Sequence, residues 1–165
     1  MKNKSTLPVL LTNPKFLIIG GGNVALQKAK ALKKNNIKFK LISPIIKNEI
    51  YKYCKNIKIK KFKLKDIKNY TYIINATGNN KITKKLLKYK KRNNILLNIV
   101  NDPKLCDFYF MATTSNKNLQ IAISTNGYSP KLAIKYRDKC QEILPKNINK
   151  LLKKYYKIRK TNIKK

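Results

Sequence analysis

Residues 16–25 have the sequence Phe16-Leu17-Ile18-Ile19-Gly20-Gly21-Gly22-Asn23-Val24-Ala25, a short apolar run that passes through three glycines into a helical pattern. The run from Lys15 to Ile19 is rich in apolar and β-branched residues, which is typical of a buried strand. Ala25, Ala29 and Leu32 then recur at helical spacing. We therefore expect a strand, a glycine turn and a helix in direct succession.

The glycine turn fits the pattern G-x-G-x-x-G/A with Gly20, Gly22 and Ala25. In this pattern the first glycine makes the tight turn, the second lets a pyrophosphate approach the backbone, and the small third residue lets helix and strand pack closely. The free N–H groups and positive dipole end of the helix then face the phosphates. The stretch therefore predicts a dinucleotide site, although a tight turn without a ligand would give a similar pattern.

The composition is strongly basic. The 165 residues include 40 Lys and Arg against 6 Asp and Glu, for a formal net charge of +34. Such a field attracts nucleic acid or anionic membranes without sequence preference. Because the lysines are spread along the whole chain together with many Asn and Ile residues, compositional bias explains the charge better than a dedicated nucleic-acid surface. A polyanionic substrate is a third explanation.

The chain has no histidine, which excludes Ser-His-Asp triads, histidine-ligated metals and imidazole acid–base catalysis. Proton transfer must then use a carboxylate, Tyr, Lys, Cys or the substrate itself. Cys54, Cys106 and Cys140 lack CxxC spacing, so we expect them to pack and predict no metal site. The apolar run near the amino terminus is broken by Pro8, and no stretch has transmembrane length, so we expect a cytoplasmic protein.

Strands and helices are expected to alternate through the first hundred residues. Strands are predicted at Lys15–Ile19, Ile37–Ile42, Ile57–Phe62, Tyr70–Ala76 and Ile95–Val100, with helices after the glycine turn, at Ile45–Cys54 and at Ile82–Arg92. This alternation is the signature of an α/β fold, a Rossmann-like parallel sheet with helices on both faces. At 165 residues we expect one domain of ordinary size, with or without a small appendage.

Two of the predicted strands end in polar residues where such sheets contact ligands. The strand Ile37–Ile42 ends at Ser43-Pro44 without the acid that usually binds the adenosine ribose. Ser43 could donate to a hydroxyl and Lys47 could tolerate a 2′-phosphate, so these residues leave NAD against NADP open. The strand Tyr70–Ala76 runs into Thr77-Gly78-Asn79-Asn80, which either contacts a ligand or only closes a turn.

The alternation stops after residue 100. Phe108–Thr114 and Leu119–Ser124 are expected to form a hairpin, and Ser129-Pro130 to start a helix that runs from about Lys131 to Leu144. A last basic amphipathic helix carries Ile148, Leu151, Leu152, Tyr155 and Ile158 on one stripe. A hairpin and two helices are too few for an independent core, so we expect a second copy of the chain to cover them in a homodimer.

Four motifs in the same order resemble the siroheme synthase family. They are Gly20-Gly21-Gly22-Asn23-Val24-Ala25, Asn75-Ala76-Thr77, the stretch Asn98-Ile99-Val100-Asn101-Asp102-Pro103-Lys104-Leu105-Cys106-Asp107-Phe108-Tyr109-Phe110, and Ile123-Ser124-Thr125-Asn126-Gly127-Tyr128-Ser129-Pro130. Within that family the chain is most similar to the NAD-dependent precorrin-2 dehydrogenases, some of which are also sirohydrochlorin ferrochelatases. The resemblance covers residues from about Pro8 to Pro145.

The resemblance implies a Rossmann-like NAD-binding domain at residues 1–104, a hairpin-plus-helix dimerisation region at 105–145 and a basic helix or tail at 146–165. It implies oxidation of precorrin-2 to sirohydrochlorin, in the biosynthesis of siroheme and other tetrapyrroles. The substrate bears eight carboxylate side chains, which suits a basic cleft. The implied NAD-binding residues are Gly20, Gly21 and Gly22 with Asn23 and Val24 at the pyrophosphate, Ser43, Pro44 and Ile45 at the adenosine, and Thr77 on the other flank.

The chain differs from the family at the position of the catalytic base. Members typically have N-x-x-D-x-P with a catalytic aspartate, and that position is Asn101 here, followed by Asp102. An amide cannot take a proton at neutral pH, so either Asp102 replaces the base or Asn101 only orients the substrate. Asp102 is our candidate base, and its alternative role is to cap the turn before Pro103. The resemblance places Ser129 near the substrate cleft, whereas a helix cap is its default role.

Dehydrogenation survives this change if binding and hydride alignment dominate the barrier, so chelation is the activity most in question. We expect another protein to methylate the earlier precursor. Two alternatives come from other classes: a basic protein that binds nucleic acid on a nucleotide-binding fold, and a module that binds NAD without catalysis. The chain has no RNA-binding motif and no clustered charge, so we expect no specific nucleic-acid partner and no membrane partner.

Overall fold

The computed structural model describes residues 9–116 and 118–162, which form two compact units. The first unit spans Val9–Tyr109, and the second begins at Phe110. The predicted amino-terminal run with Pro8, the turn residue Lys117 and residues 163–165 of the basic tail lie outside the described residues. None of the helices within residues 9–116 and 118–162 combines the length and the hydropathy that a bilayer span requires.

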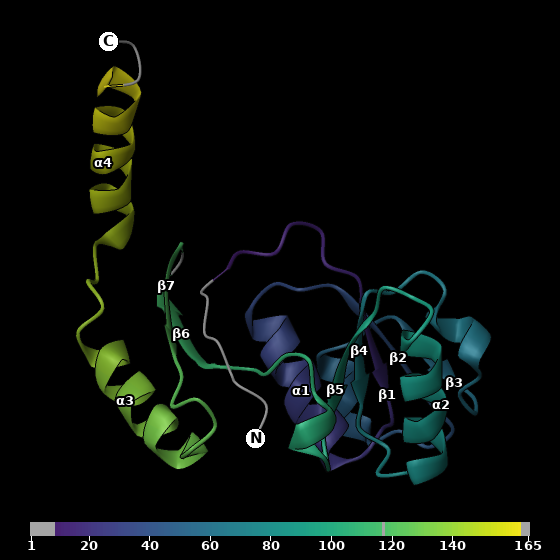
Figure 1. Ribbon diagram of the computed structural model, residues 1–165. Coiled ribbons are helices and arrows are strands. Elements are labelled where there is room, and N and C mark those ends of the chain that lie inside the picture. Colours follow the sequence, from purple (N-terminus) through teal and green to yellow (C-terminus); the bar gives the residue numbers. More distant parts are fainter. Residues whose placement is uncertain (1–8, 117, 163–165) are drawn as a thin grey trace. The chain divides into compact units, whose positions relative to one another are not determined.

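The first unit is a five-stranded parallel sheet with strand order β3-β2-β1-β4-β5. The strands are β1 (Phe16–Ile19), β2 (Phe39–Ser43), β3 (Ile57–Ile59), β4 (Tyr72–Asn75) and β5 (Leu96–Ile99). The helices α1 (Asn23–Lys34) and α2 (Asn80–Lys90) lie on opposite faces of the sheet (Figure 1). Short 3-10 turns complete the unit: η1 (Asn48–Lys52), η2 (Leu64–Ile67) and η3 (Pro103–Leu105). The predicted Rossmann-like α/β fold is confirmed.

The central strand β1 is buried along its whole length. Its four residues are at most 3% exposed, as expected for a parallel strand covered on both faces. Leu17 and Ile19 pack in one apolar cluster with Leu86 of α2. Phe16 alternates to the other face and stacks on Tyr72 of β4, with ring centroids 4.6 Å apart. Because β1 lies in the middle of the core, the glycine turn that follows it has a fixed position.

The outer edge of β5 is covered by the chain that follows η3. Asp107 N–H donates to Leu97 O at 2.7 Å, Asp107 Oδ2 accepts from Leu97 N–H at 2.8 Å, and Lys90 forms an ion pair with the same carboxylate. Asp107 therefore has a structural role at this strand. Ile99 N–H donates to the buried Cys106 Sγ at 3.1 Å, which gives this cysteine the packing role predicted for it. The edge strand is thus protected from pairing with another chain.

Several predicted boundaries differ from the structure. The strand expected at Ile57–Phe62 ends at Ile59, where Lys60 turns to pair with Asp66. The short helix expected at Ile45–Cys54 is the single 3-10 turn η1. The helix expected from Ile82 begins earlier, because Asn79 caps α2. The strand expected from Phe108 begins at Ala112, because the Phe108 ring packs edge-on against two aromatic rings of the sheet.

The second unit contains the predicted hairpin and two helices. Strands β6 (Ala112–Asn116) and β7 (Leu119–Ile123) pair antiparallel, and α3 (Pro130–Glu142) packs against both. Asn116 Nδ2 donates to Pro145 O at 2.8 Å after the end of α3. The last helix, α4 (Ile148–Asn162), carries the predicted apolar stripe. Ile148 is buried, but most large apolar residues of α3 and α4 are exposed: Leu132, Ile134, Tyr136, Leu151, Tyr155, Tyr156 and Ile158.

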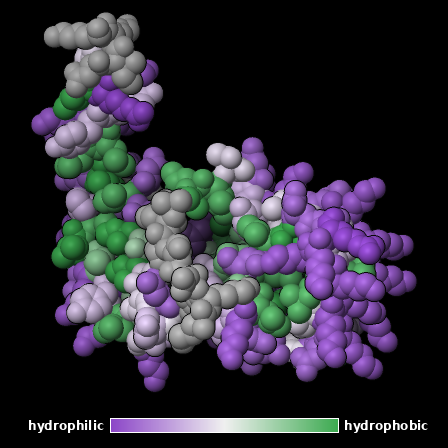
Figure 2. All heavy atoms as spheres, viewed as in Figure 1, coloured by the Kyte–Doolittle hydropathy of each residue, from purple (hydrophilic) through white to green (hydrophobic). Residues whose placement is uncertain are grey.

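The surfaces of the two units differ in character. On the face shown in Figure 2, hydrophilic residues predominate on the first unit, with smaller hydrophobic areas between them, and hydrophobic residues gather on the second, over the helices α3 and α4. A two-stranded sheet with one packed helix buries little apolar surface for its length.

Candidate functional site

The glycine turn lies at the carboxyl end of β1, between the ends of β2 and β4. Gly20 has a φ of +115°, which L residues rarely adopt. A Cβ atom at Gly20 would lie 2.7 Å from Ala76 O and 3.2 Å from Thr77 N. The first glycine therefore makes the tight turn, as predicted, and the turn touches the loop that follows β4.

Gly21 contacts the loop that follows β2. A Cβ atom at this position would lie 2.2 Å from Ile45 O and 3.0 Å from Ser43 Oγ. Gly21 O also accepts a hydrogen bond of 2.9 Å from Lys47 N–H. The sequence pattern treats this middle position as variable, so its packing role was not predicted. The structure shows that it joins the glycine turn to the β2 loop.

Gly22 faces open space at the first turn of α1. No atom lies within 4 Å of the position that its Cβ would take, and no side chain caps the helix here. Asn23 is exposed and Val24 half-buried, while Ala25 is fully buried and packs the helix closely. An open glycine before uncapped helical N–H groups is a suitable cradle for a pyrophosphate. The residues present therefore fit the predicted dinucleotide.

The β2 side of the site contains Ser43, Pro44 and Ile45. The Ser43 hydroxyl donates to Ile45 O at 2.7 Å, and the residue is only 6% exposed. Its hydrogen therefore closes the local turn. Pro44 and Ile45 are exposed beside the glycine turn. Further along the same loop, Lys47 Nζ donates to Asn23 Oδ1 at 2.9 Å and lies 3.3 Å from Glu49 Oε1.

The β4 side contains Thr77, whose conformation is held by its neighbours. Thr77 Oγ1 donates to the buried Asn75 Oδ1 at 2.7 Å, and Asn75 Nδ2 donates to Thr83 Oγ1 of α2 at 2.9 Å. Asn79 caps α2 by accepting from the N–H groups of Lys81 and Ile82. Gly78 has a φ of +65° and makes the turn. Residues 77–80 therefore close a turn, which is one of the two roles that the sequence offered. This turn holds Thr77 near Gly20.

The candidate base lies in the loop after β5, at the same carboxyl-terminal end of the parallel strands as the glycine turn. Asp102 Oδ1 accepts from Lys104 N–H at 3.1 Å and caps η3, which is the alternative role that the sequence offered. Asn101 beside it is exposed. Burial raises the pKa of the nearby Cys106 thiol, which keeps it neutral and leaves it a packing group. Within residues 9–116 and 118–162, no group of three or more Cys, Asp and Glu side chains is arranged to hold a metal ion.

Ser129 belongs to the second unit. Its hydroxyl accepts from Leu132 N–H at 3.2 Å and caps α3, as predicted for the default role. Thr125 Oγ1 accepts from Ser129 N–H at 3.0 Å. The predicted residues of the first unit therefore all lie at the carboxyl ends of the parallel strands. Ser129 lies in the other unit.

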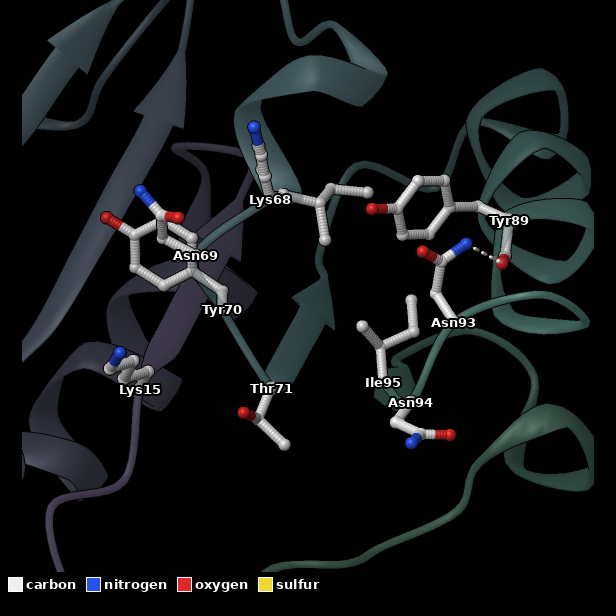
Figure 3. Close-up of a pocket in the computed structure, with 10 residues that line it drawn as sticks. Lys15, Lys68, Asn69, Tyr70, Thr71, Tyr89, Asn93, Asn94 and Ile95 are labelled. Carbon is white, nitrogen blue, oxygen red and sulfur yellow. Dashed lines mark hydrogen bonds between the residues drawn. The ribbon is translucent and has the colours of Figure 1, made fainter.

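A separate pocket of about 290 Å³ lies at the opposite end of the strands, where β1, β4 and β5 begin (Figure 3). It is lined by residues that precede β1, β4 and β5, among them Lys15, Tyr70, Thr71 and Ile95. Asn93 Nδ2 donates to Tyr89 O at 2.8 Å on its α2 side. Because parallel sheets of this type bind dinucleotides at the carboxyl ends of their strands, this pocket is distinct from the predicted site.

The fold and the glycine turn define a dinucleotide-binding protein of the Rossmann type, and family comparison agrees. A family model described as "Putative NAD(P)-binding" matches residues 7–112, and one described as "Sirohaem biosynthesis protein central" matches residues 116–139. The chain therefore belongs to the siroheme synthase N-terminal family of putative NAD(P)-binding proteins. Both the predicted resemblance and the prediction of an NAD-type cofactor are confirmed at this level.

Individual relatives agree with the family. Siroheme synthase of Pseudoalteromonas translucida is 30% identical over 151 residues, covering 88% of this chain and 32% of that protein. Siroheme synthase of Ruthia magnifica is 32% identical over 139 residues, covering 82% of this chain and 29% of that protein. The chain thus spans about a third of the length of the curated relatives it matches. The solved structure of SirC, precorrin-2 dehydrogenase, has the same fold, with a TM-score of 0.68 at 23% identity, covering 94% of this chain and 79% of that chain.

Substitutions at two adjacent glycines test the described turn. We expect Gly21→Ala to lower the free energy of unfolding by about 2 to 3 kcal/mol, because its Cβ would overlap backbone atoms of the β2 loop. Gly22→Ser should change it by less than about 0.5 kcal/mol, because the position is open and serine is a good N-cap residue. Denaturant unfolding followed by circular dichroism measures both. Equal losses in the two variants would contradict the described packing.

Proposed function

We propose that the chain oxidises precorrin-2 to sirohydrochlorin with NAD⁺, as a step in siroheme biosynthesis. One observation carries the proposal: an open Gly22 at the start of α1, preceded by two tightly packed glycines, in a chain of the siroheme synthase N-terminal family. The names of its relatives, siroheme synthase and precorrin-2 dehydrogenase, supply the substrate class.

In this proposal the glycine turn holds the dinucleotide. Gly22, Asn23 and Val24 present backbone N–H groups to the pyrophosphate, Ser43, Pro44 and Ile45 contact the adenosine, and Thr77 contacts the opposite flank. The cofactor, when bound, supplies a nicotinamide ring that accepts the hydride. The contacts among the glycine turn, the β2 loop and the β4 loop hold these residues in place before binding, which lowers the entropic cost of orienting the reactants.

We assign Asp102 as the base that accepts the proton released in the oxidation, and Asn101 as the residue that orients the substrate. One oxygen of the Asp102 carboxylate caps η3, which fixes the side chain, and the carboxylate has a second oxygen that can accept a proton. The net charge of +34 attracts the carboxylate side chains of the substrate over a long range. We assign Ser129 to the substrate cleft, in the region that carries the second family match.

Gly22→Asp separates binding from folding. The carboxylate should cap α1 and leave the fold at least as stable as the wild type, yet repel the cofactor phosphates and weaken NADH binding by about 100-fold or more. NADH formation from NAD⁺ and precorrin-2 made in situ should fall accordingly. The control is Gly22→Ser, which places a side chain in the same open space but adds no charge. Undiminished turnover in Gly22→Asp would exclude the assigned site.

A second prediction concerns iron as a further substrate. After dehydrogenation in an anaerobic cuvette, Fe²⁺ added to the wild-type protein should enter sirohydrochlorin at the uncatalysed rate. Asn101 has the position of the family's aspartate and cannot accept the pyrrole protons, and Asp102 is assigned to the dehydrogenation alone. Asn101→Asp should raise the insertion rate at least about tenfold, since general bases contribute 10²–10⁴-fold. The absorption change of the macrocycle reports the reaction. Fast insertion by the wild type would instead assign the base to another group.

We further propose that residues 105–145 form the dimerisation region of a cytoplasmic homodimer, after an NAD-binding domain at 1–104 and before a basic end at 146–165. The exposed Leu132 and Tyr136 on one side of α3 support this, because a second copy would bury them. Sedimentation velocity should find a dimer for the wild type and a larger monomer fraction for Leu132→Glu. Lys135→Gln makes the same change in charge at an exposed position of α3 and should remain dimeric.

A further inference from the structure

The end of β2 lacks the carboxylate that usually accepts the ribose hydroxyls of NAD. Ser43 is the last residue of the strand, but its hydroxyl donates to Ile45 O and its side chain is buried. Pro44 has no N–H donor, and Ile45 is apolar and 82% exposed. None of these residues distinguishes a ribose 2′-hydroxyl from a 2′-phosphate, because a preference for NAD normally depends on an acid at this point.

Lys47 follows this point closely in the sequence and is attached to the glycine turn. Its backbone N–H donates to Gly21 O at 2.9 Å, and its ammonium donates to Asn23 Oδ1 at 2.9 Å. The residue is therefore held at both ends against the residues that are to bind the pyrophosphate. Its side chain is still 41% exposed, and an ammonium has three donors, so it can also bind an anion from solvent.

Glu49 opposes this effect. Its carboxylate lies 3.3 Å from Lys47 Nζ and is 47% exposed. A hydrogen bond with its own backbone N–H, together with Lys47, lowers the pKa of Glu49, so the group is charged at neutral pH. A phosphate bound at Lys47 would be repelled by this carboxylate. The pair therefore has one residue that favours a 2′-phosphate and one that disfavours it.

We propose that Lys47 is a specificity-determining residue of the cofactor site, and that it lets the protein bind a dinucleotide with a 2′-phosphate as well as one without. The inference rests on the proposed function, since it requires the dinucleotide to lie on the glycine turn. Lys47 contacts the phosphate with a charge-assisted hydrogen bond, and Glu49 limits the preference so that NAD is still bound.

Titration of the full-length protein with NADH and with NADPH tests the proposal. The chain has no tryptophan, so the nicotinamide fluorescence can be followed without overlap from that residue. The wild type should bind the two with dissociation constants within about tenfold of each other. Lys47→Glu should weaken NADPH by at least about tenfold more than NADH, because it replaces an attractive charge with a repulsive one.

Two further variants complete the test. Glu49→Gln should shift the ratio in the opposite direction, towards NADPH, because it removes the repulsive charge. Lys85→Glu makes the same change in charge on an exposed position of α2 and should leave the ratio unchanged, which controls for the long-range field. Circular dichroism of each variant verifies that it is folded.

The outcomes separate this inference from the proposed function. A wild type that prefers NADH by more than about 100-fold, or a Lys47→Glu variant that weakens both dinucleotides equally, would overturn the role of Lys47 while leaving the glycine site intact. Binding of neither NADH nor NADPH by the folded wild type would contradict the proposed function itself, and this inference with it.

Discussion

The close contact between the glycine backbone and two neighbouring loops is the constraint on which the rest of the site depends. Gly20 lies against Ala76 and Thr77, and Gly21 lies against Ser43 and Ile45, at distances that leave no room for a Cβ atom. Three loops from separate parts of the sequence are thereby held at one edge of the sheet. Only Gly22 faces open space among these three, so the turn is rigid on two sides and open on the third.

This arrangement depends on the buried strand before it. Because β1 is in the centre of the sheet and pairs with both β2 and β4, the turn at its end must lie between the loops that follow those strands. The polar groups of the loops are satisfied locally: Ser43 by Ile45, Thr77 by Asn75, and Asn75 by Thr83 of α2. A ligand at this edge therefore meets a prepared surface, with little to reorganise on binding.

The unusual charge acts at two ranges. Spread over the whole chain, the lysines produce a long-range field suited to the proposed polycarboxylate substrate. At the proposed cofactor site the charge is local, and one of the chain's six carboxylates, Glu49, pairs with Lys47. Other carboxylates have structural partners: Asp66 pairs with Lys60, and Asp107 pairs with Lys90 and closes the edge of β5. Asp102 caps η3 and has the position from which an acid–base role is proposed.

The sequence by itself determined the fold class and the place of the glycine turn, because both depend on local patterns: apolar strands alternating with helical spacing, and glycines between a strand and a helix. It also gave a helix cap as the default role of Ser129 and as the alternative role of Asp102, since capping depends on residues three positions apart or fewer. Tertiary structure decided what depends on contacts between distant residues. The backbone of Gly21 is closely packed because of Ile45, the side chain of Ser43 is buried beside Gly21, and Lys47 is linked to the start of α1 because its ammonium reaches Asn23, 24 positions away. No pattern of neighbouring residues encodes these contacts, because the order of the parallel strands brings the loops together.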